Sequence, residues 1–293
     1  MNDEVLIFAN PIAGRGRGKV VARRLERELR SIGIGAQIFL QPPSELSPAA
    51  INRSAIAAIS IGGDGTLRQV ASLLLAAGET QPPLLPLPMG TANLMAKHLG
   101  LHGGLDAVID TIRRQHIVRL DAARANGELL LLVAGVGFDG LVVHLLDEMR
   151  KGPITLISYV LPTLLTLRDY KFPPITVEVD GLTIARDLPA VAFIGNIREY
   201  GVGAAILTEA RSDDGLLDIC ILPCRDYRDL AEILVLLATE EHTKRDGVIY
   251  LRGKSVHIHS NQKLPIQIDG EAAGFTPLQV AILPAAVRFL VPT

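Results

Sequence analysis

Three glycine-rich turns near the start of the chain, at residues 10–18, 62–66 and 90–93, have the composition of a phosphate-binding site. Glycine allows the backbone to approach a ligand closely, and the free N–H groups at the start of a helix suit a phosphate. Asp64, inside the second turn, would repel a bare phosphate, so it indicates a divalent cation or a ribose hydroxyl beside it. The alternative interpretation is a tight turn with an aspartate cap.

The first of these turns is basic but is not a P-loop. Val20 follows Gly18 and Lys19 where a P-loop has Ser or Thr, and Ala13 takes the place of the first glycine. Two interpretations remain, a phosphate-binding loop of another type and a flexible basic loop.

Two further turns concentrate carboxylates. Asp213, Asp214 and Asp218 lie within six residues, which indicates either a turn before a strand or an oxygen-ligand site for a hard cation. Asp269 and Glu271 flank a glycine at another strand end. This second turn is either a plain hairpin or a carboxylate offered to a substrate hydroxyl.

The pattern of apolar runs predicts how these turns are positioned. Short, fully apolar runs alternate with helical spacing in the first part of the chain, at residues 5–9, 36–40, 55–61 and 84–87. This alternation predicts a parallel sheet covered by helices on both faces, whose ligands bind beyond the carboxyl ends of the strands. From about residue 117 strand-like stretches follow one another, with helical inserts at 141–151 and 226–241. They predict a second, mostly antiparallel domain.

Composition limits the partners and the location. The 293 residues are enough for two domains, and 29 Lys and Arg against 31 Asp and Glu give a net charge of −2. Such a chain lacks the basic field of a nucleic-acid binder, so we expect no nucleic-acid partner. We find no signal peptide and no apolar run of the ~18 residues that span a membrane. We therefore expect a cytoplasmic protein.

One apolar segment predicts peripheral contact with a membrane. Residues 154–167 are apolar, are broken by Pro162, and are flanked by Lys151, Arg168 and Lys171. Such a segment can lie at the inner face of a membrane with its cations near anionic headgroups. The alternative is a buried core helix.

Seven motifs in order along nearly the whole chain resemble the diacylglycerol kinase catalytic-domain family of bacterial lipid kinases. They lie at residues 10–14, 62–66, 88–93, 135–139, 200–203, 213–218 and 269–271. Sphingosine and ceramide kinases are more distant members, and NAD kinases share the fold. The resemblance implies an α/β nucleotide-binding domain at 1–118, to which 283–293 returns, and a β-sandwich lipid-substrate domain at 119–282. It implies ATP and Mg²⁺ as cofactors and diacylglycerol or a related lipid as substrate.

The resemblance also implies roles for individual residues. The implied ATP contacts are Asn10, Pro11, Ile12, Ala13, Gly14, Gly63, Asp64, Gly65, Thr66, Leu67, Arg68, Gln69 and Thr91. Glu271 is the implied general base, with Asp269 as the alternative carboxylate. Asp64 and Asp121 are implied in an aspartate–water–magnesium network. A structural Mg²⁺ is implied at Asp214 and the backbone carbonyls of Arg211 and Leu216.

The chain departs from the family pattern at a few positions. Leu94 stands where many members have Asp, Arg68 and Gln69 stand where members tend to have Asn and Glu, and Val202 interrupts a glycine triplet. Leu94 removes one carboxylate of the magnesium network. Two other functions therefore remain open, an NAD kinase-like enzyme with a soluble substrate and a non-catalytic nucleotide- or lipid-binding protein. A homodimer is a further expectation.

Overall fold

The computed structural model describes residues 3–78, 81–102, 104–149, 170–201 and 204–293. The chain divides into two compact units, one formed by Met1–Leu120 with Ala285–Thr293 and the other by Asp121–Pro284. The apolar segment 154–167, with Lys151 and Arg168, lies outside the described residues. Among the residues that are described, no helix is long and apolar enough to cross a membrane.

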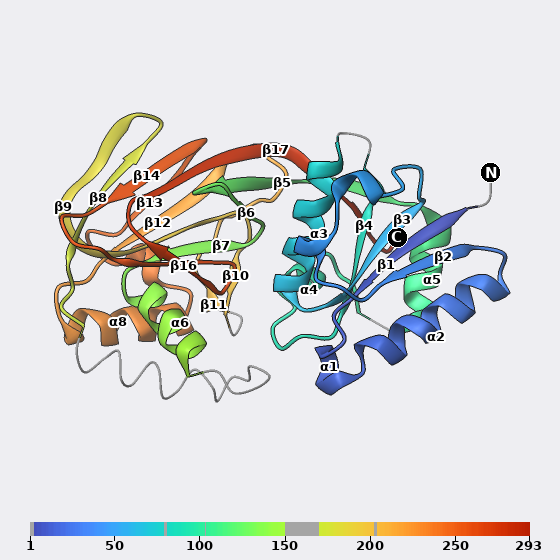
Figure 1. Ribbon diagram of the computed structural model, residues 1–293. Helices are drawn as coiled ribbons and strands as arrows, with labels where there is room; N and C mark the ends of the chain where they lie inside the picture. Colours follow the sequence, from blue (N-terminus) through green and yellow to red (C-terminus); the bar gives the residue numbers. More distant parts are fainter. Residues whose placement is uncertain (1–2, 79–80, 103, 150–169, 202–203) are drawn as a thin grey trace. The chain divides into compact units, whose positions relative to one another are not determined.

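A parallel sheet forms the centre of the first unit (Figure 1). Its strands are β1 (Glu4–Ala9), β2 (Gly35–Phe39), β3 (Ala57–Gly62) and β4 (Leu84–Pro88), in the order β4-β3-β1-β2. Every pair among these four is parallel. The strands are continuous apolar runs because both faces of the sheet are buried. The prediction of a parallel α/β domain is confirmed.

Helices cover both faces of this sheet. α2 (Gly18–Ser31) and α5 (Leu105–Arg114) share one buried cluster with alternate residues of the strands, among them Ile7 and Ile59. α3 (Asp64–Ala77) lies on the other side of the sheet in Figure 1. The short helix α1 (Ala13–Gly16) lies in the first glycine-rich turn, and the short helix α4 (Leu94–His98) follows the third.

The second unit is mostly antiparallel, as predicted. Its strands are β6 (Glu128–Leu130), β7 (Val133–Val136), β8 (Pro174–Val179), β9 (Leu182–Gly195), β12 (Leu217–Pro223), β13 (Ile249–Gly253), β14 (Ser255–His259), β15 (Pro265–Ile268) and β16 (Glu271–Phe275). One group follows the order β16-β15-β7-β9-β12-β13, and a second follows β9-β8-β14-β17. The long strand β9 belongs to both groups, and one buried apolar cluster draws on both. α6 (Phe138–Glu148) and α8 (Tyr227–Ala238) complete the unit, with a small β10–β11 pair (Glu199–Tyr200, Ala204–Ala205).

Two strands, β5 (Ile117–Ala125) and β17 (Leu278–Leu290), contribute residues to both units. In the first unit Phe289 of β17 pairs with Leu84 of β4, and in the second unit β17 pairs with β14. The end of the chain therefore belongs to the first sheet.

The structure contains strands that the sequence pattern did not predict, among them β10, β11 and β13, and it extends β9 and β17. Within the part of the chain that the structure describes, β13 pairs with β12 alone and ends its group of strands. β9 begins at Leu182, whereas the apolar run that predicts it begins at residue 190. The exposed first half of β9 is held by backbone pairing with β8 rather than by burial.

Candidate active site

The three glycine-rich turns meet at one edge of the parallel sheet. They follow β1, β3 and β4, which are neighbours in the sheet, so their carboxyl ends lie together. The Asn10 N–H donates to the Ile61 carbonyl oxygen at 3.1 Å, and the Gly14 N–H donates to the Met89 carbonyl oxygen at 3.2 Å. The Met89 N–H donates to the Gly62 carbonyl oxygen at 2.8 Å. Backbone hydrogen bonds thus join residues that are up to 75 positions apart in sequence, from Gly14 to Met89.

Two glycines make the closest approach between the second and third turns. A Cβ on Gly90 would lie 2.6 Å from the Gly63 Cα, and a Cβ on Gly63 would lie 3.2 Å from the Gly90 Cα. The Gly90 N–H donates to Asn93 Oδ1 at 2.8 Å, which holds the third turn in place. A side chain at Gly90 would therefore push the two turns apart.

The first turn is folded rather than irregular. Gly14 and Arg15 have positive φ values of 58° and 61°, and together with Ala13 and Gly16 they form the short helix α1. Asn10 Oδ1 accepts the Ile12 N–H at 3.1 Å, while Asn10 Nδ2 lies 3.5 Å from Thr66 Oγ1 in the second turn. These contacts order the loop, and its binding of phosphate stays a prediction.

Asp64 links the second turn to the third. Its two carboxylate oxygens accept the N–H groups of Leu94 and Met95, each at 3.1 Å, so the carboxylate lies at the N-terminus of α4. Burial raises the pKa of Asp64, and these hydrogen bonds oppose that shift. Leu94, which replaces the family aspartate, has its side chain buried and 4% exposed. That position offers an apolar contact rather than a second carboxylate.

The remaining predicted ATP contacts differ in exposure. Leu67 and Arg68 of α3 are buried, whereas Gln69, Thr91, Pro11 and Ile12 are exposed. The Leu67 side chain belongs to the hydrophobic core, and its N–H donates to the Gly63 carbonyl oxygen at 3.0 Å. Gly65 and Thr66, with Asp64, form the first turn of α3. Their role in binding ATP stays a prediction.

The two carboxylates of the last motif have opposite surroundings. Asp269 is 8% exposed, and its oxygens accept the N–H groups of Leu131, Leu132 and Val133 at 2.9, 2.8 and 3.2 Å. Glu271, the first residue of β16, is exposed. Asp269 therefore anchors this turn to the chain around Leu131, and Glu271 is the carboxylate that solvent or a substrate reaches.

A further carboxylate, Asp139, lies with Gln267 beside Gly135, and Gln267 bonds to this turn. The Tyr200 hydroxyl donates to Asp139 Oδ2 at 3.1 Å, and Gln267 Oε1 accepts the Gly270 N–H at 2.8 Å. Burial raises the pKa of Asp139 to about 7, against the hydrogen bond from Tyr200. We did not assign Asp139 from the sequence, although it ends the motif at residues 135–139.

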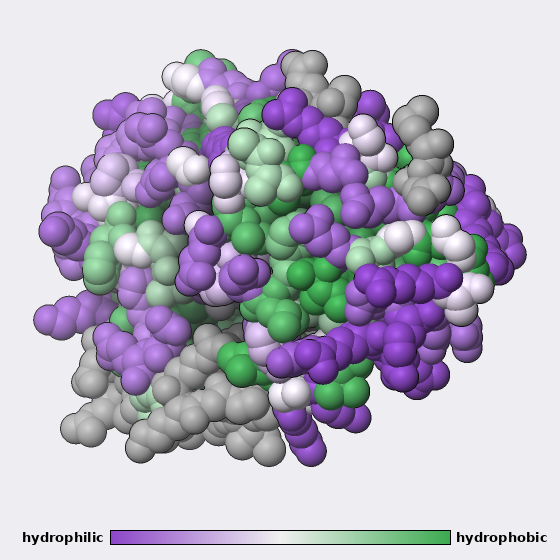
Figure 2. Space-filling view, turned by 45° about the vertical axis from the view of Figure 1, so that its right-hand side comes forward, coloured by the Kyte–Doolittle hydropathy of each residue, from purple (hydrophilic) through white to green (hydrophobic). Residues whose placement is uncertain are grey.

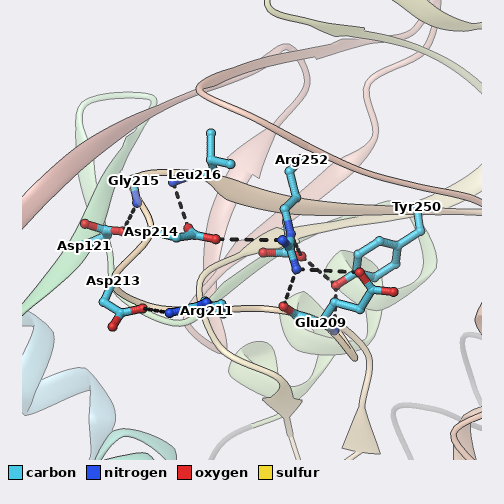
Figure 3. Close-up of polar contacts among 10 residues, drawn as sticks. Asp121, Glu209, Arg211, Asp213, Asp214, Gly215, Leu216, Tyr250 and Arg252 are labelled. Atoms are coloured by element: carbon cyan, nitrogen blue, oxygen red, sulfur yellow. Dashed lines mark hydrogen bonds and ion pairs between the residues drawn. The ribbon is translucent and has the colours of Figure 1, made fainter.

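The predicted magnesium loop is bound to a strand far away in sequence (Figure 3). Asp214 Oδ1 accepts the Leu216 N–H at 3.1 Å, and the Gly215 N–H donates to Asp121 Oδ2 at 2.7 Å. The Arg211 guanidinium lies 3.4 Å from Asp213 rather than at Asp214. Asp121 lies in the second unit with this loop.

Arg252 brings a positive charge to the same loop. Its Nε lies 3.1 Å from Asp218 Oδ1, and its Nη1 lies 4.0 Å from Asp214 Oδ2. Asp218 is fully buried and also accepts the Tyr250 hydroxyl at 2.8 Å. The carboxylates of this loop are thus partly neutralised by the protein itself (Figure 3).

The donors present suit a hard cation by type, since they are one carboxylate and backbone carbonyls. Within the described part of the chain, no three His, Cys, Asp or Glu side chains are grouped to hold a metal. A magnesium ion at this loop would therefore depend on Asp214, the carbonyls of Arg211 and Leu216, and water. The two cysteines, Cys220 and Cys224, are buried, and burial raises the pKa of both thiols to about 12, which disfavours metal-binding thiolates.

Comparison with known families accounts for nearly the whole chain. Residues 4–125 match the diacylglycerol kinase catalytic domain, and residues 132–291 match the YegS C-terminal NAD kinase beta sandwich-like domain.

Individual relatives are distant. The chain is 28% identical over 238 residues to the uncharacterized protein sll0036 of Synechocystis, a match that covers 80% of this chain and 54% of that relative. It therefore spans about half the length of that protein. It is 26% identical to the diacylglycerol kinases of Staphylococcus carnosus, over 80% of this chain and 76% of the relative, and of Staphylococcus aureus, over 75% and 69%.

Solved structures share the fold. A crystal structure of a diacylglycerol kinase from Bacillus anthracis has a TM-score of 0.75 and 21% identity, and covers 99% of this chain and 97% of its own. A second structure from the same organism has a TM-score of 0.80 and 22% identity, over 99% and 95%. At these identities the likeness concerns the fold alone.

Proposed function

The chain belongs to the diacylglycerol kinase catalytic-domain family with a YegS-type C-terminal domain, and we propose that it is an ATP-dependent lipid kinase. The reaction is transfer of the γ-phosphate of ATP to a hydroxyl of diacylglycerol or a related lipid. The observation that carries the proposal is the meeting of three glycine-rich turns at Gly63 and Gly90, beside the start of α3.

This first-unit site is suited to hold the phosphates of a nucleotide. The first N–H groups of a helix have no partner within the helix and carry a partial positive charge. The glycines leave no side chain between those donors and a ligand. Phosphoryl transfer depends mainly on positioning and on neutralising charge, and these turns supply the positioning.

Two groups of residues complete the proposed reaction. Mg²⁺, held by Asp214 and the carbonyls of Arg211 and Leu216, would supply positive charge that supports the active conformation. Asp64, whose carboxylate accepts the N–H groups of Leu94 and Met95, would orient a cation or a nucleotide hydroxyl. Asp121, bonded to Gly215, would connect the magnesium loop to strand β5.

Glu271 is the proposed general base. A lipid hydroxyl is almost fully protonated near neutral pH, so its proton must leave during or just after attack. Glu271 is exposed at the start of β16 and can accept that proton. A general base of this kind contributes roughly 10²–10⁴ in rate.

A second candidate function is phosphorylation of a soluble dinucleotide. It is favoured by the match of residues 132–291 to an NAD kinase beta sandwich-like domain. The deciding experiment incubates the full chain with γ-labelled ATP and Mg²⁺, with either a total lipid extract or NAD. Label in the organic phase supports the lipid kinase, and label in the aqueous dinucleotide supports the alternative.

Label in neither phase would contradict both enzymes and leave a non-catalytic nucleotide- or lipid-binding protein. A cytoplasmic location at the inner face of the membrane and a homodimer stay predictions.

A further inference from the structure

Arg252 forms an ion pair of a different kind from those between surface side chains. Hydrophilic side chains spread over much of the face shown in Figure 2, and pairs of exposed side chains such as Arg24 and Glu28 are screened by water. The Arg252 side chain is partly exposed, but its partner Asp218 is fully buried. We therefore expect Arg252 to stay with Asp218, because removing one partner of a buried pair is strongly destabilising.

The pairing of two strands determines where this guanidinium lies. Arg252 of β13 lies directly opposite Asp218 of β12. Its Nε lies 3.1 Å from Asp218 Oδ1, and the Tyr250 hydroxyl donates to the same oxygen at 2.8 Å. The far end of the guanidinium lies beside loop 211–216, which precedes β12 (Figure 3). The backbone register of β12 and β13 thus brings a positive charge to this loop.

The far end of Arg252 has more than one partner. Its Nη1 lies 4.0 Å from Asp214 Oδ2. Its Nη2 donates to the Glu209 carbonyl oxygen at 2.6 Å and lies 3.6 Å from Glu209 Oε2. A guanidinium has five N–H donors in a fixed geometry, so Arg252 can give up the contact with Asp214 and keep those with Asp218 and Glu209.

Asp214 is the one carboxylate among the residues proposed to hold Mg²⁺. Its Oδ1 accepts the Leu216 N–H at 3.1 Å, and its Oδ2 is the oxygen that faces Arg252. A magnesium ion at Asp214 and the Arg252 guanidinium would neutralise the same carboxylate. Two cations that share one carboxylate repel each other, so each lowers the affinity of Asp214 for the other.

We propose that Arg252 competes with Mg²⁺ for Asp214 and thereby sets the magnesium affinity of loop 211–216. The guanidinium neutralises Asp214 when magnesium is scarce, and it withdraws to Asp218 and Glu209 when the metal binds. The loop then responds to the concentration of free Mg²⁺ instead of holding the metal permanently. The proposal rests on the proposed function, because that function places Mg²⁺ at Asp214.

Magnesium binding without nucleotide tests the competition. Calorimetric titration of the full chain with Mg²⁺ gives a dissociation constant, and the binding that is lost in Asp214→Ala is binding at the loop. Arg252→Gln should lower this dissociation constant at least about fivefold, because the repelling charge is gone. Arg252→Lys keeps the charge and should bind Mg²⁺ within about twofold of the unchanged protein.

Lys254→Gln is the matched control, since it removes the same charge two residues further along the chain. Lys254 is exposed, and its backbone N–H donates to Asp180. Because exposed charges are screened by solvent and salt, this variant should change the dissociation constant less than about twofold. Equal gains in affinity in Lys254→Gln and Arg252→Gln would reveal a general effect of net charge and overturn the competition. Unchanged or weaker Mg²⁺ binding by folded Arg252→Gln would overturn it as well.

A second variant covers the case in which Arg252→Gln does not fold, which circular dichroism detects. Asp218→Asn/Arg252→Gln removes both charges of the buried pair and keeps the net charge of the chain, and asparagine can still accept the Tyr250 hydroxyl. Arg252 is the member of the pair that contacts Asp214, so this double variant should also bind Mg²⁺ more tightly than the unchanged protein. Equal dissociation constants would contradict the proposal.

Kinase measurements separate this proposal from the proposed function. With saturating ATP and a lipid extract, activation by additional free Mg²⁺ should reach its half-maximum at a lower concentration in Arg252→Gln. Equal half-maxima in two active proteins would contradict the competition alone. If the unchanged protein transfers no phosphate to lipid, the proposed function is refuted, and the calorimetric titration still decides the role of Arg252. If Asp214→Ala binds Mg²⁺ like the unchanged protein, the competition fails even where phosphate transfer is observed.

Discussion

Asp269 and Glu271 are two residues apart, but the Asp269 side chain is buried and the Glu271 side chain is exposed. Asp269 is buried with its carboxylate accepting three backbone N–H groups, whereas Glu271 is exposed at the first position of β16. The Asp269 oxygens are shielded from solvent and are bonded to backbone donors, whereas the Glu271 side chain is at the surface. The pair therefore separates into a structural anchor and a candidate base.

Replacement of these two carboxylates should affect different quantities. Glu271→Gln should lower turnover at least about a hundredfold while ATP affinity and the thermal midpoint stay unchanged, because the amide cannot accept the proton. Asp269→Asn should lower the free energy of unfolding by about 1–3 kcal/mol, because one backbone N–H would face an amide N–H. Steady-state kinetics and urea unfolding measure the two effects.

The reverse pattern would contradict the assignment. If Glu271→Gln keeps turnover within about threefold while a fully stable Asp269→Asn loses it, Asp269 is the base.

Gly90→Ala should weaken ATP binding at least about tenfold, because the added Cβ would lie 2.6 Å from Gly63 and separate the turns that form the site. Gly104→Ala is the matched control. Gly104 has φ −87° at the start of α5, and a Cβ there would meet nothing within 4 Å. Calorimetric titration with ATP measures affinity, and circular dichroism measures folding. Normal affinity in a folded Gly90→Ala protein would remove this contact from the nucleotide site.

Asp214→Ala should abolish stabilisation of the protein by Mg²⁺. A cation that binds only the folded state raises the free energy of unfolding, by about 1 kcal/mol when its concentration is several times the dissociation constant. Asp213→Ala is the control, because the Asp213 side chain is 57% exposed and its ion pair is with Arg211. Thermal unfolding in Mg²⁺ and in a chelator measures the difference. An equal response of the unchanged protein and Asp214→Ala would place any magnesium elsewhere.

Asp139 should make the protein less stable as pH rises. Its pKa in the folded protein is raised to about 7, above the ordinary value of an aspartate in the unfolded chain. Its stabilising contribution is therefore complete below about pH 4 and is lost as pH rises through 7. Because Asp139 keeps partial solvent exposure, we expect a loss on the order of 1 kcal/mol between pH 5 and 8.

Asp139→Asn should lose less stability over that interval, since asparagine imitates the protonated carboxyl. Urea unfolding at the two pH values measures both proteins. The same loss in both would mean that Asp139 is ionised throughout this range.

Local patterns in the sequence were enough to predict the framework of the site. Apolar runs that end in glycine turns predict parallel strands, because each run and the helix after it are short-range features. The motifs at residues 62–66 and 269–271 likewise marked the regions that hold Asp64 and Glu271. Segments without such a pattern, such as β13, were missed because backbone pairing holds them.

Only the tertiary structure decided how these residues are connected. The approach of Gly63 to Gly90 and the hydrogen bonds that Asp64 accepts from α4 join segments about 30 residues apart. The hydrogen bond from Gly215 to Asp121 joins residues that are 94 apart. Asp269 differs from Glu271 because its carboxylate accepts a hydrogen bond from the distant Leu131 N–H. No local pattern encodes such contacts, because they arise when separate strands pack into one sheet. The sequence thus identified the turns, and packing decided which of their side chains are buried and bonded and which are exposed.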